Sequence, residues 1–243
     1  MSGHSKWAQI KRQKAVTDKK RGSIFTKLGN AITLAARTGG GDPEMNFKLR
    51  LAIDRAKAVN FPKDNIDRAI KRGTGELGGA EIVEVVYEGY GPSGVAIFIE
   101  TLTGNKNRTV ADIRHILSLH GGKIGSANSV AWMFAKAGVI RIAREHKPQE
   151  WENIELELID AGATDIQEEE EGITILCPPS LLDAIKKVLE AHTVPITSSD
   201  VEMNPTTPVE IADPAEHERI EKLISALETL EDVTAVSTNY VSA

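Results

Sequence analysis

Three glycines form the most familiar chemical motif in the sequence. The stretch GYGPSG at 89–94 matches the G-x-G-x-x-G pattern of dinucleotide-binding proteins, and a β-rich run precedes it. In that pattern a helix must follow at once, because the helix N-terminus binds the pyrophosphate. Here the next residues, VAIFIETLT, favour a strand, and a proline lies inside the motif. We therefore predict a turn between two strands, with Tyr87 and Tyr90 beside it as part of a candidate partner surface.

Nucleophiles and metal ligands are sparse in this chain. His115 and His120 are five residues apart, so on a helix they do not share a face as a zinc-binding pair would. The single cysteine, Cys177, excludes a disulfide framework, and its apolar surroundings predict a structural thiol. The glutamates at 168–171 are typical of a solvated hairpin tip. The sequence thus predicts no enzyme, no metal site, no cofactor and no small-molecule substrate.

Basic residues are concentrated in the N-terminal third of the chain. The 243 residues carry a net charge of −6, but residues 1–79 contain 17 basic and 7 acidic residues, a balance of +10. The remaining 12 basic and 28 acidic residues give −16. Such an asymmetry favours a polyanion-binding segment joined to an acidic body, and solvated helix faces are the alternative.

The first 23 residues look like a basic arm with one acid, Asp18. On a helix Trp7, Lys11 and Lys14 would share a face, and no apolar stripe ties this segment to a core or to a membrane surface. We interpret it as an arm that becomes ordered on a phosphate backbone. A cationic face at 63–72 extends this footprint or is a solvated helix face. The predicted nucleic-acid-binding residues are His4, Lys6, Trp7, Lys11, Arg12, Lys14, Lys19, Lys20, Arg21, Lys27, Lys63, Arg68, Lys71 and Arg72.

Apolar periodicity predicts three short helices after the arm, which carry Lys27 and the cations at 63–72. The first covers 24–37 and ends at the glycines 39–41. Asp42 and Pro43 begin the second, and Pro62 begins the third. The predicted inward face of the second helix consists of Met45, Leu49, Ala52, Ile53, Ala56 and Val59.

The pattern changes to mixed strands and helices after a glycine-rich linker at 73–79. Two strands within 81–103, a helix within 105–122 and a strand at 129–134 come first. Residues 138–205 then follow the order βαββαβ of a ferredoxin-like unit. The tail supplies one helix and one strand, which complete the earlier block. We predict an α+β fold: an N-terminal three-helix domain (1–79) followed by two ferredoxin-like α/β domains, one (137–205) inserted in the other (80–136 and 206–243).

Long motifs across essentially the whole chain resemble the YebC/PmpR family. They are GHSKWAQIK, DKKRGSIFTKL, FPKDNIDRAIKRGTGE, YEGYGPSGVA and TGNKNRTVADIRHILSLHGG. Asn128 departs from the pattern, because the family usually has glycine there. Positions that match the family motifs are His4, Ser5, Lys6, Trp7, Lys11, Lys14, Lys19, Arg21, Lys27, Pro62, Lys63, Asn65, Arg68, Lys71, Asn107 and Arg108; the last two join the candidate partner surface.

The resemblance implies three domains around a cavity in a cytoplasmic bacterial protein described as a DNA-binding transcriptional regulator. Mitochondrial relatives act as translational activators, and bacterial members are linked to the ribosome and to relief of stalling at proline-rich stretches. We expect a cytoplasmic, non-enzymatic regulator of gene expression that binds DNA or, as the alternative, ribosomal RNA. The sequence identifies no recognition helix that would read DNA bases. Ribosomal RNA is recognised mainly through its phosphates and its shape, which suits a basic arm. A scaffold that acts through the interdomain cavity is a third class.

Overall fold

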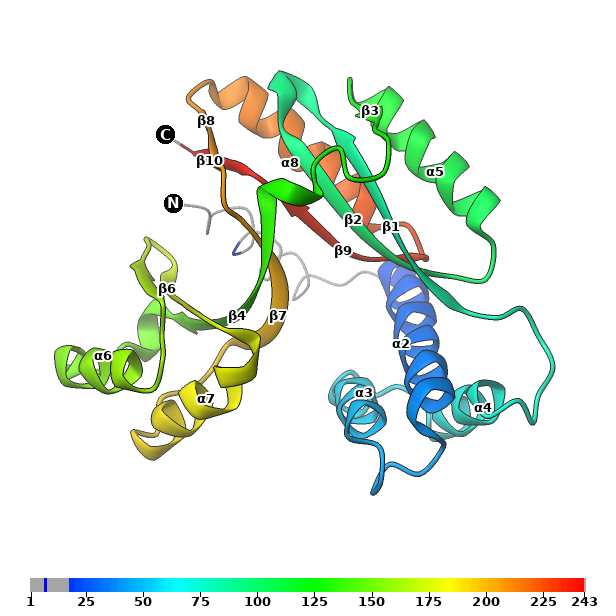
Figure 1. Cartoon of the computed structure of the whole chain (residues 1–243), viewed down its shortest axis with the longest axis horizontal. Coiled ribbons are helices and arrows are strands. Elements are labelled where there is room, and N and C mark those ends of the chain that lie inside the picture. The colour runs from blue at the N-terminus through cyan, green and yellow to red at the C-terminus, as the bar shows by residue number, and fades with distance from the viewer. Residues whose placement is uncertain (1–6, 8–17, 243) are drawn as a thin grey trace.

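Three helices form the first part of the chain in the computed structural model, which describes residue 7 and residues 18–242 (Figure 1). α2 (Asp18–Gly39) is the longest, and α3 (Phe47–Ala58) and α4 (Lys63–Gly73) both pack against it. The approach of α4 to α2 is very close, since a Cβ on Gly73 would lie 2.4 Å from the Thr33 carbonyl oxygen. The buried core of the three helices consists of Ile32, Ala35, Ala36, Leu49, Ile53, Ala56, Phe61, Ile66 and Ala69.

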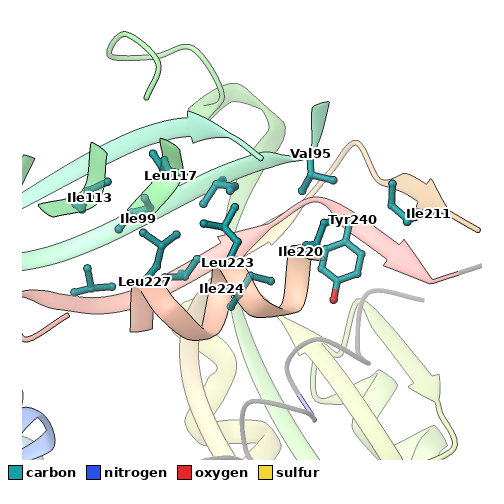
Figure 2. Close-up of a cluster of buried hydrophobic side chains, with 13 residues drawn as sticks. Val95, Ile99, Ile113, Leu117, Ile211, Ile220, Leu223, Ile224, Leu227 and Tyr240 are labelled. Carbon is teal, nitrogen blue, oxygen red and sulfur yellow. The ribbon is translucent and has the colours of Figure 1, made fainter. Parts of the chain in front are cut away.

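A four-stranded antiparallel sheet follows, with the strand order β3-β1-β2-β9. Two helices, α5 and α8, cover one face of it, and Figure 2 shows Ile113 and Leu117 of α5 and Leu223 and Leu227 of α8 beside Ile99 of β2. The last strand, β9, comes from the C-terminal end of the chain, so the sheet joins segments more than 100 residues apart. The elements are β1 (Val83–Tyr90), β2 (Ala96–Thr103), α5 (Lys106–Leu119), β3 (Lys123–Ile124), α8 (Pro214–Glu228) and β9 (Val233–Thr238).

The second four-stranded sheet has the order β5-β6-β4-β7, which is the spatial order of a ferredoxin-like unit. Its isoleucines alternate with polar residues along β4 and β6, and they pack under α6 and α7. The α+β class with a helical part followed by sheet domains is confirmed. The elements are β4 (Phe134–Ala143), α6 (Trp151–Asp160), β5 (Asp165–Glu168), β6 (Gly172–Cys177), α7 (Leu182–Ala191) and β7 (Ser198–Pro205).

A small parallel ribbon, which the sequence did not predict, ends the chain. β8 (Val209–Ile211) pairs with β10 (Tyr240–Ser242), and β10 is separated from β9 by Asn239. The Asn239 side chain accepts a hydrogen bond from Ala96 N at 2.8 Å and donates to the Thr207 carbonyl at 2.9 Å, so it ties the ribbon to the first sheet. From these pairings we propose the domain limits 1–79, 80–136 with 206–243, and 137–205, although β4 runs across the limit at 136.

Two local predictions are wrong. The segment 129–134 is mostly a turn with a 3₁₀ helix at Ala131–Met133, and only Phe134 belongs to a strand. The second helix begins at Phe47 and not at the Asp42–Pro43 pair, so Met45 lies in a turn and Val59 lies after the helix, both exposed.

Candidate nucleic-acid interface

The outward face of α4 carries four exposed cations, Lys63, Arg68, Lys71 and Arg72. The local sequence explains this orientation, because Ile66 and Ala69 point into the three-helix core and the cations occupy the opposite arc. Within residues 7 and 18–242, none of the four forms an ion pair. These charges are therefore available to an anionic partner.

The predicted arm is mostly outside the described residues, and this holds for His4, Lys6, Lys11, Arg12 and Lys14. Lys19, Lys20 and Arg21 lie in the first turn of α2. Trp7 was predicted to lie on an exposed face together with cations, but it is only 3% exposed. Its ring lies against Gly172 at the start of β6, where a Cβ would be 2.9 Å from Trp7 Cζ2. The expectation that nothing anchors this segment to a core is wrong for Trp7.

Lys27 is half-buried between α2 and the C-terminal end of α8, and it is not a free surface cation. Its Nζ donates a hydrogen bond to the Glu228 carbonyl oxygen at 2.5 Å. Burial lowers the pKa of Lys27, and the nearby Glu228 charge opposes that shift. A cation at a helix C-terminus interacts favourably with the helix dipole. Lys27 thus joins the helical part to the first sheet domain, which corrects its assignment as a phosphate-binding residue.

Arg108 also has an internal partner. Its Nη2 donates to both carboxylate oxygens of Asp232, at 3.0 and 2.8 Å, and Asp232 also accepts from the Thr109 hydroxyl at 2.7 Å. This bond, together with the Asp232 charge, raises the pKa of Arg108. The network fixes the start of α5 to the loop before β9, so we assign Arg108 to the fold. Asn107, its neighbour in α5, remains exposed.

The glycine motif forms the predicted turn between β1 and β2, with a 3₁₀ helix at Pro92–Gly94. Tyr90 lines a cavity of about 460 Å³ there, and Lys123 Nζ lies 5.8 Å from the centre of its ring. The Tyr90 hydroxyl donates to the Ser129 carbonyl at 3.0 Å, and the Tyr87 hydroxyl donates to the Lys106 carbonyl at 3.2 Å. Burial, helped by Asp232, raises the pKa of Tyr87. Both phenols therefore have structural partners.

Asn128, the departure from the family motif, occupies a position that suits glycine. Its φ of +63° lies in the left-handed region, which asparagine tolerates better than most residues. The buried Glu88 carboxylate holds this loop by accepting hydrogen bonds from the backbone N–H groups of Asn128, Val130 and Ala131 at 2.7 to 2.8 Å. The loop conformation is thus compatible with asparagine.

No group of three or more histidine, cysteine or carboxylate side chains that could hold a metal ion occurs within residues 7 and 18–242. Cys177 is buried at the end of β6, and burial raises the pKa of its thiol, which disfavours the nucleophilic thiolate. In the same described part, no helix is long and apolar enough to cross a membrane.

Sequence periodicity missed one surface feature of the helical part. Met45 was placed on the inward face of the second helix, yet it is exposed just before α3, and Phe47 and Leu51 of α3 are exposed beside it. The missed signal is Asn46, a strong helix N-cap residue, which shifts the start of the helix past Met45.

A basic helical part followed by two α/β sheet parts defines an α+β protein. Two family models match the chain: "TACO1/YebC protein N-terminal domain" at residues 5–76 and "TACO1/YebC second and third domain" at residues 82–240. The chain belongs to the TACO1/YebC family.

Relatives of known name and structure match nearly the whole chain. A "Probable transcriptional regulatory protein" of Chlorobaculum tepidum is 52% identical over 240 residues, which are 98% of this chain and 94% of the relative. Another of that name, from Thermoanaerobacter pseudethanolicus, is 50% identical over 98% of this chain and 96% of its own. The crystal structure of a conserved hypothetical protein from Aquifex aeolicus matches with a TM-score of 0.82 and 39% identity, over 94% of this chain and 93% of that one.

Proposed function

We propose that this protein is a non-enzymatic regulator of gene expression that binds the phosphate backbone of a nucleic acid through its helical domain. One observation carries the proposal: four exposed cations on one face of the short helix α4, without an ion-pair partner within the described residues. Cations placed side by side on a helix face suit the regularly spaced phosphates of a nucleic acid, and binding releases condensed counterions.

The charge distribution supports the same function. Residues 80–243 carry −16, so the sheet domains repel a polyanion and orient it towards the helical domain. The names of the relatives support a regulatory role. DNA is the target that those names favour, and ribosomal RNA in a translation factor is the alternative. Either target is consistent with a cytoplasmic protein.

A triple charge reversal on α4 tests the proposal. The variant Arg68→Glu, Lys71→Glu, Arg72→Glu is expected to weaken binding to duplex DNA and to a ribosomal RNA fragment by at least about tenfold at 100 mM salt, because three phosphate contacts are lost. Fluorescence anisotropy over a series of salt concentrations measures this effect. The slope of log affinity against log salt should fall by about three, one unit for each cation.

The matched control reverses three exposed cations on the sheet domains, Lys106, Arg114 and Lys187, so that net charge changes equally. Its affinity should remain within about threefold of the parent, since general repulsion acts weakly at this distance in salt. Equal losses in both variants would mean that only net charge matters and that α4 is not the contact face. Sedimentation of lysate with and without ribonuclease then distinguishes the two targets, because only a ribosome-bound protein shifts to lighter fractions when RNA is degraded.

A further inference from the structure

Three large apolar side chains project into solvent where α2 turns into α3. Met45 is 85% exposed, Phe47 61% and Leu51 43%. Phe47 and Leu51 are four residues apart on α3 and so lie on one face, with Met45 just ahead of them. In Figure 1 the turn between α2 and α3 lies at the lower end of the molecule, away from both sheets. We name these three side chains the apolar tip.

The buried Asn46 keeps the apolar tip exposed. Its side-chain oxygen caps α3 by accepting from Leu49 N at 3.1 Å, and its Nδ2 donates to the carbonyls of Ala35 and Gly40, each at 2.8 Å. With the amide locked on both sides, its neighbours Met45 and Phe47 cannot turn inward. The exposure of the apolar tip is therefore a fixed feature of the fold.

Two cations of α3, Lys48 and Arg50, flank the apolar tip. The Arg50 guanidinium lies over the Phe47 ring, 5.7 Å from its centre, and its Nη1 also donates to the Pro43 carbonyl at 3.3 Å. Lys48 is exposed next to Phe47. Two turns after Phe47, Arg55 forms an ion pair with Asp200 of β7. An aromatic ring held beside a guanidinium group, with an exposed lysine next in the chain, is a combination that suits bases together with their phosphates.

We propose that the apolar tip is a stacking platform for unpaired bases of a single-stranded nucleic acid segment, an inference that rests on the proposed function. The bases would stack on Phe47 and pack against Met45 and Leu51, while Lys48 and Arg50 contact the adjoining phosphates. Bases in a duplex are already stacked on each other, so the platform favours single strands, bulges and loops. The α4 face supplies affinity for any backbone, and the apolar tip supplies the preference for unpaired bases.

The test compares one strand with its own duplex. The double variant Met45→Ala, Phe47→Ala is titrated with a 12-nucleotide strand that carries 2-aminopurine, as RNA and as DNA, and with the corresponding duplexes. We expect at least about a tenfold loss of single-strand affinity and loss of the 2-aminopurine quenching that accompanies stacking. Duplex affinity and the salt slope should not change. The RNA and DNA arms show which strand the platform accepts.

The control Leu119→Ala, Leu156→Ala removes two comparably exposed apolar side chains from α5 and α6. It should bind single strands like the parent, and all variants should retain the parent's melting temperature. Unchanged single-strand affinity in the Met45/Phe47 variant would overturn the platform and indicate a protein partner for the apolar tip. An equal loss for strand and duplex would also overturn it, because the apolar tip would then not discriminate unpaired bases. If the α4 reversal weakens binding while this double variant does not, only the platform fails. If the parent binds neither strand nor duplex, the proposed function fails with it.

Discussion

The basic residues of this protein fall into two groups: some form bonds within the fold, and others are exposed to solvent. Lys27 and Arg108 were equivalent to Lys71 and Arg72 in sequence terms, since all four are basic residues in amphipathic helices. The difference comes from distant partners: the Glu228 carbonyl and the Asp232 carboxylate lie at least 120 positions away in the chain. The half-buried Lys27 ammonium and the buried Asp232 carboxylate need such partners, whereas an exposed cation without one is solvated and free to exchange water for phosphate.

The titration of Cys177 gives a prediction at the scale of one residue. Because burial raises the pKa of the folded thiol, this group contributes stability that is fully present below the unfolded pKa of about 8.5 and is lost as pH rises above it. We expect the free energy of unfolding in urea to fall more steeply between pH 8 and 10 in the parent than in Cys177→Ala. Lysines and tyrosines titrate in both proteins, so the difference between the slopes isolates Cys177. Parallel pH profiles would contradict a raised thiol pKa.

At the scale of elements, the sequence predicted what local periodicity determines. The inward residues Ile66 and Ala69 of α4 and the strand order β5-β6-β4-β7 follow from apolar spacing and from the βαββαβ element order. Elements that depend on distant hydrogen bonds were missed. The segment 129–134 has strand-forming residues, but Glu88 binds its backbone N–H groups and bends it into a turn.

The candidate site was predictable to the same extent. The exposed face of α4 followed from the pattern of a single helix. The exposure of Met45 depends on carbonyls of Ala35 and Gly40 that Asn46 reaches only in the folded turn. Apolar periodicity placed Met45 on the inward face because it does not register the hydrogen bonds of Asn46 that hold this turn outside the core.

The hydrogen bonds that the Glu88 carboxylate accepts from the loop after β3 lead to a prediction about that loop. In Glu88→Gln an NH₂ group replaces one carboxylate oxygen, so at least one buried backbone N–H loses its acceptor, at a cost of about 1–3 kcal/mol. Urea unfolding measures the loss, and hydrogen exchange should accelerate at Asn128, Val130 and Ala131. Glu84→Gln, an exposed position on the same strand, is the control and should stay within about 0.5 kcal/mol of the parent. Equal stability of both variants would show that the loop holds its shape without the carboxylate.

At the scale of the whole molecule, contacts between distant parts of the chain attach the helical domain to both sheet domains. The Lys27 bond and a hydrogen bond from the Asn30 amide to the Leu102 carbonyl at 3.4 Å attach α2 to the first sheet domain. The Arg55 ion pair with Asp200 connects α3 to the second. Because exposed ion pairs contribute little to stability, this second attachment is weak by itself, and the packing of Trp7 against Gly172 adds a further contact with the second sheet.

Trp7 provides the strongest test of that connection, because two assignments of this residue predict opposite results. A base-stacking Trp7 would be needed for nucleic-acid affinity and not for stability. The structure instead buries it against Gly172, 165 positions away, where Trp7→Ala removes a large packed ring. We expect the variant to lose about 3–5 kcal/mol of unfolding free energy. Trp132→Ala, at a tryptophan that is 66% exposed, should lose less than about 1 kcal/mol.

Tryptophan fluorescence adds a check that leaves Trp7 itself in place. With Trp132 replaced by Phe, only Trp7 and Trp151 emit, and both are buried. Acrylamide should quench this emission weakly, and saturating nucleic acid should not change the quenching if Trp7 stays packed on the second sheet. A stable Trp7→Ala variant with reduced nucleic-acid affinity would overturn the anchoring role. A rise in acrylamide quenching on binding would show that the partner pulls Trp7 off the sheet, so that the arm and the inserted domain separate when the nucleic acid is bound.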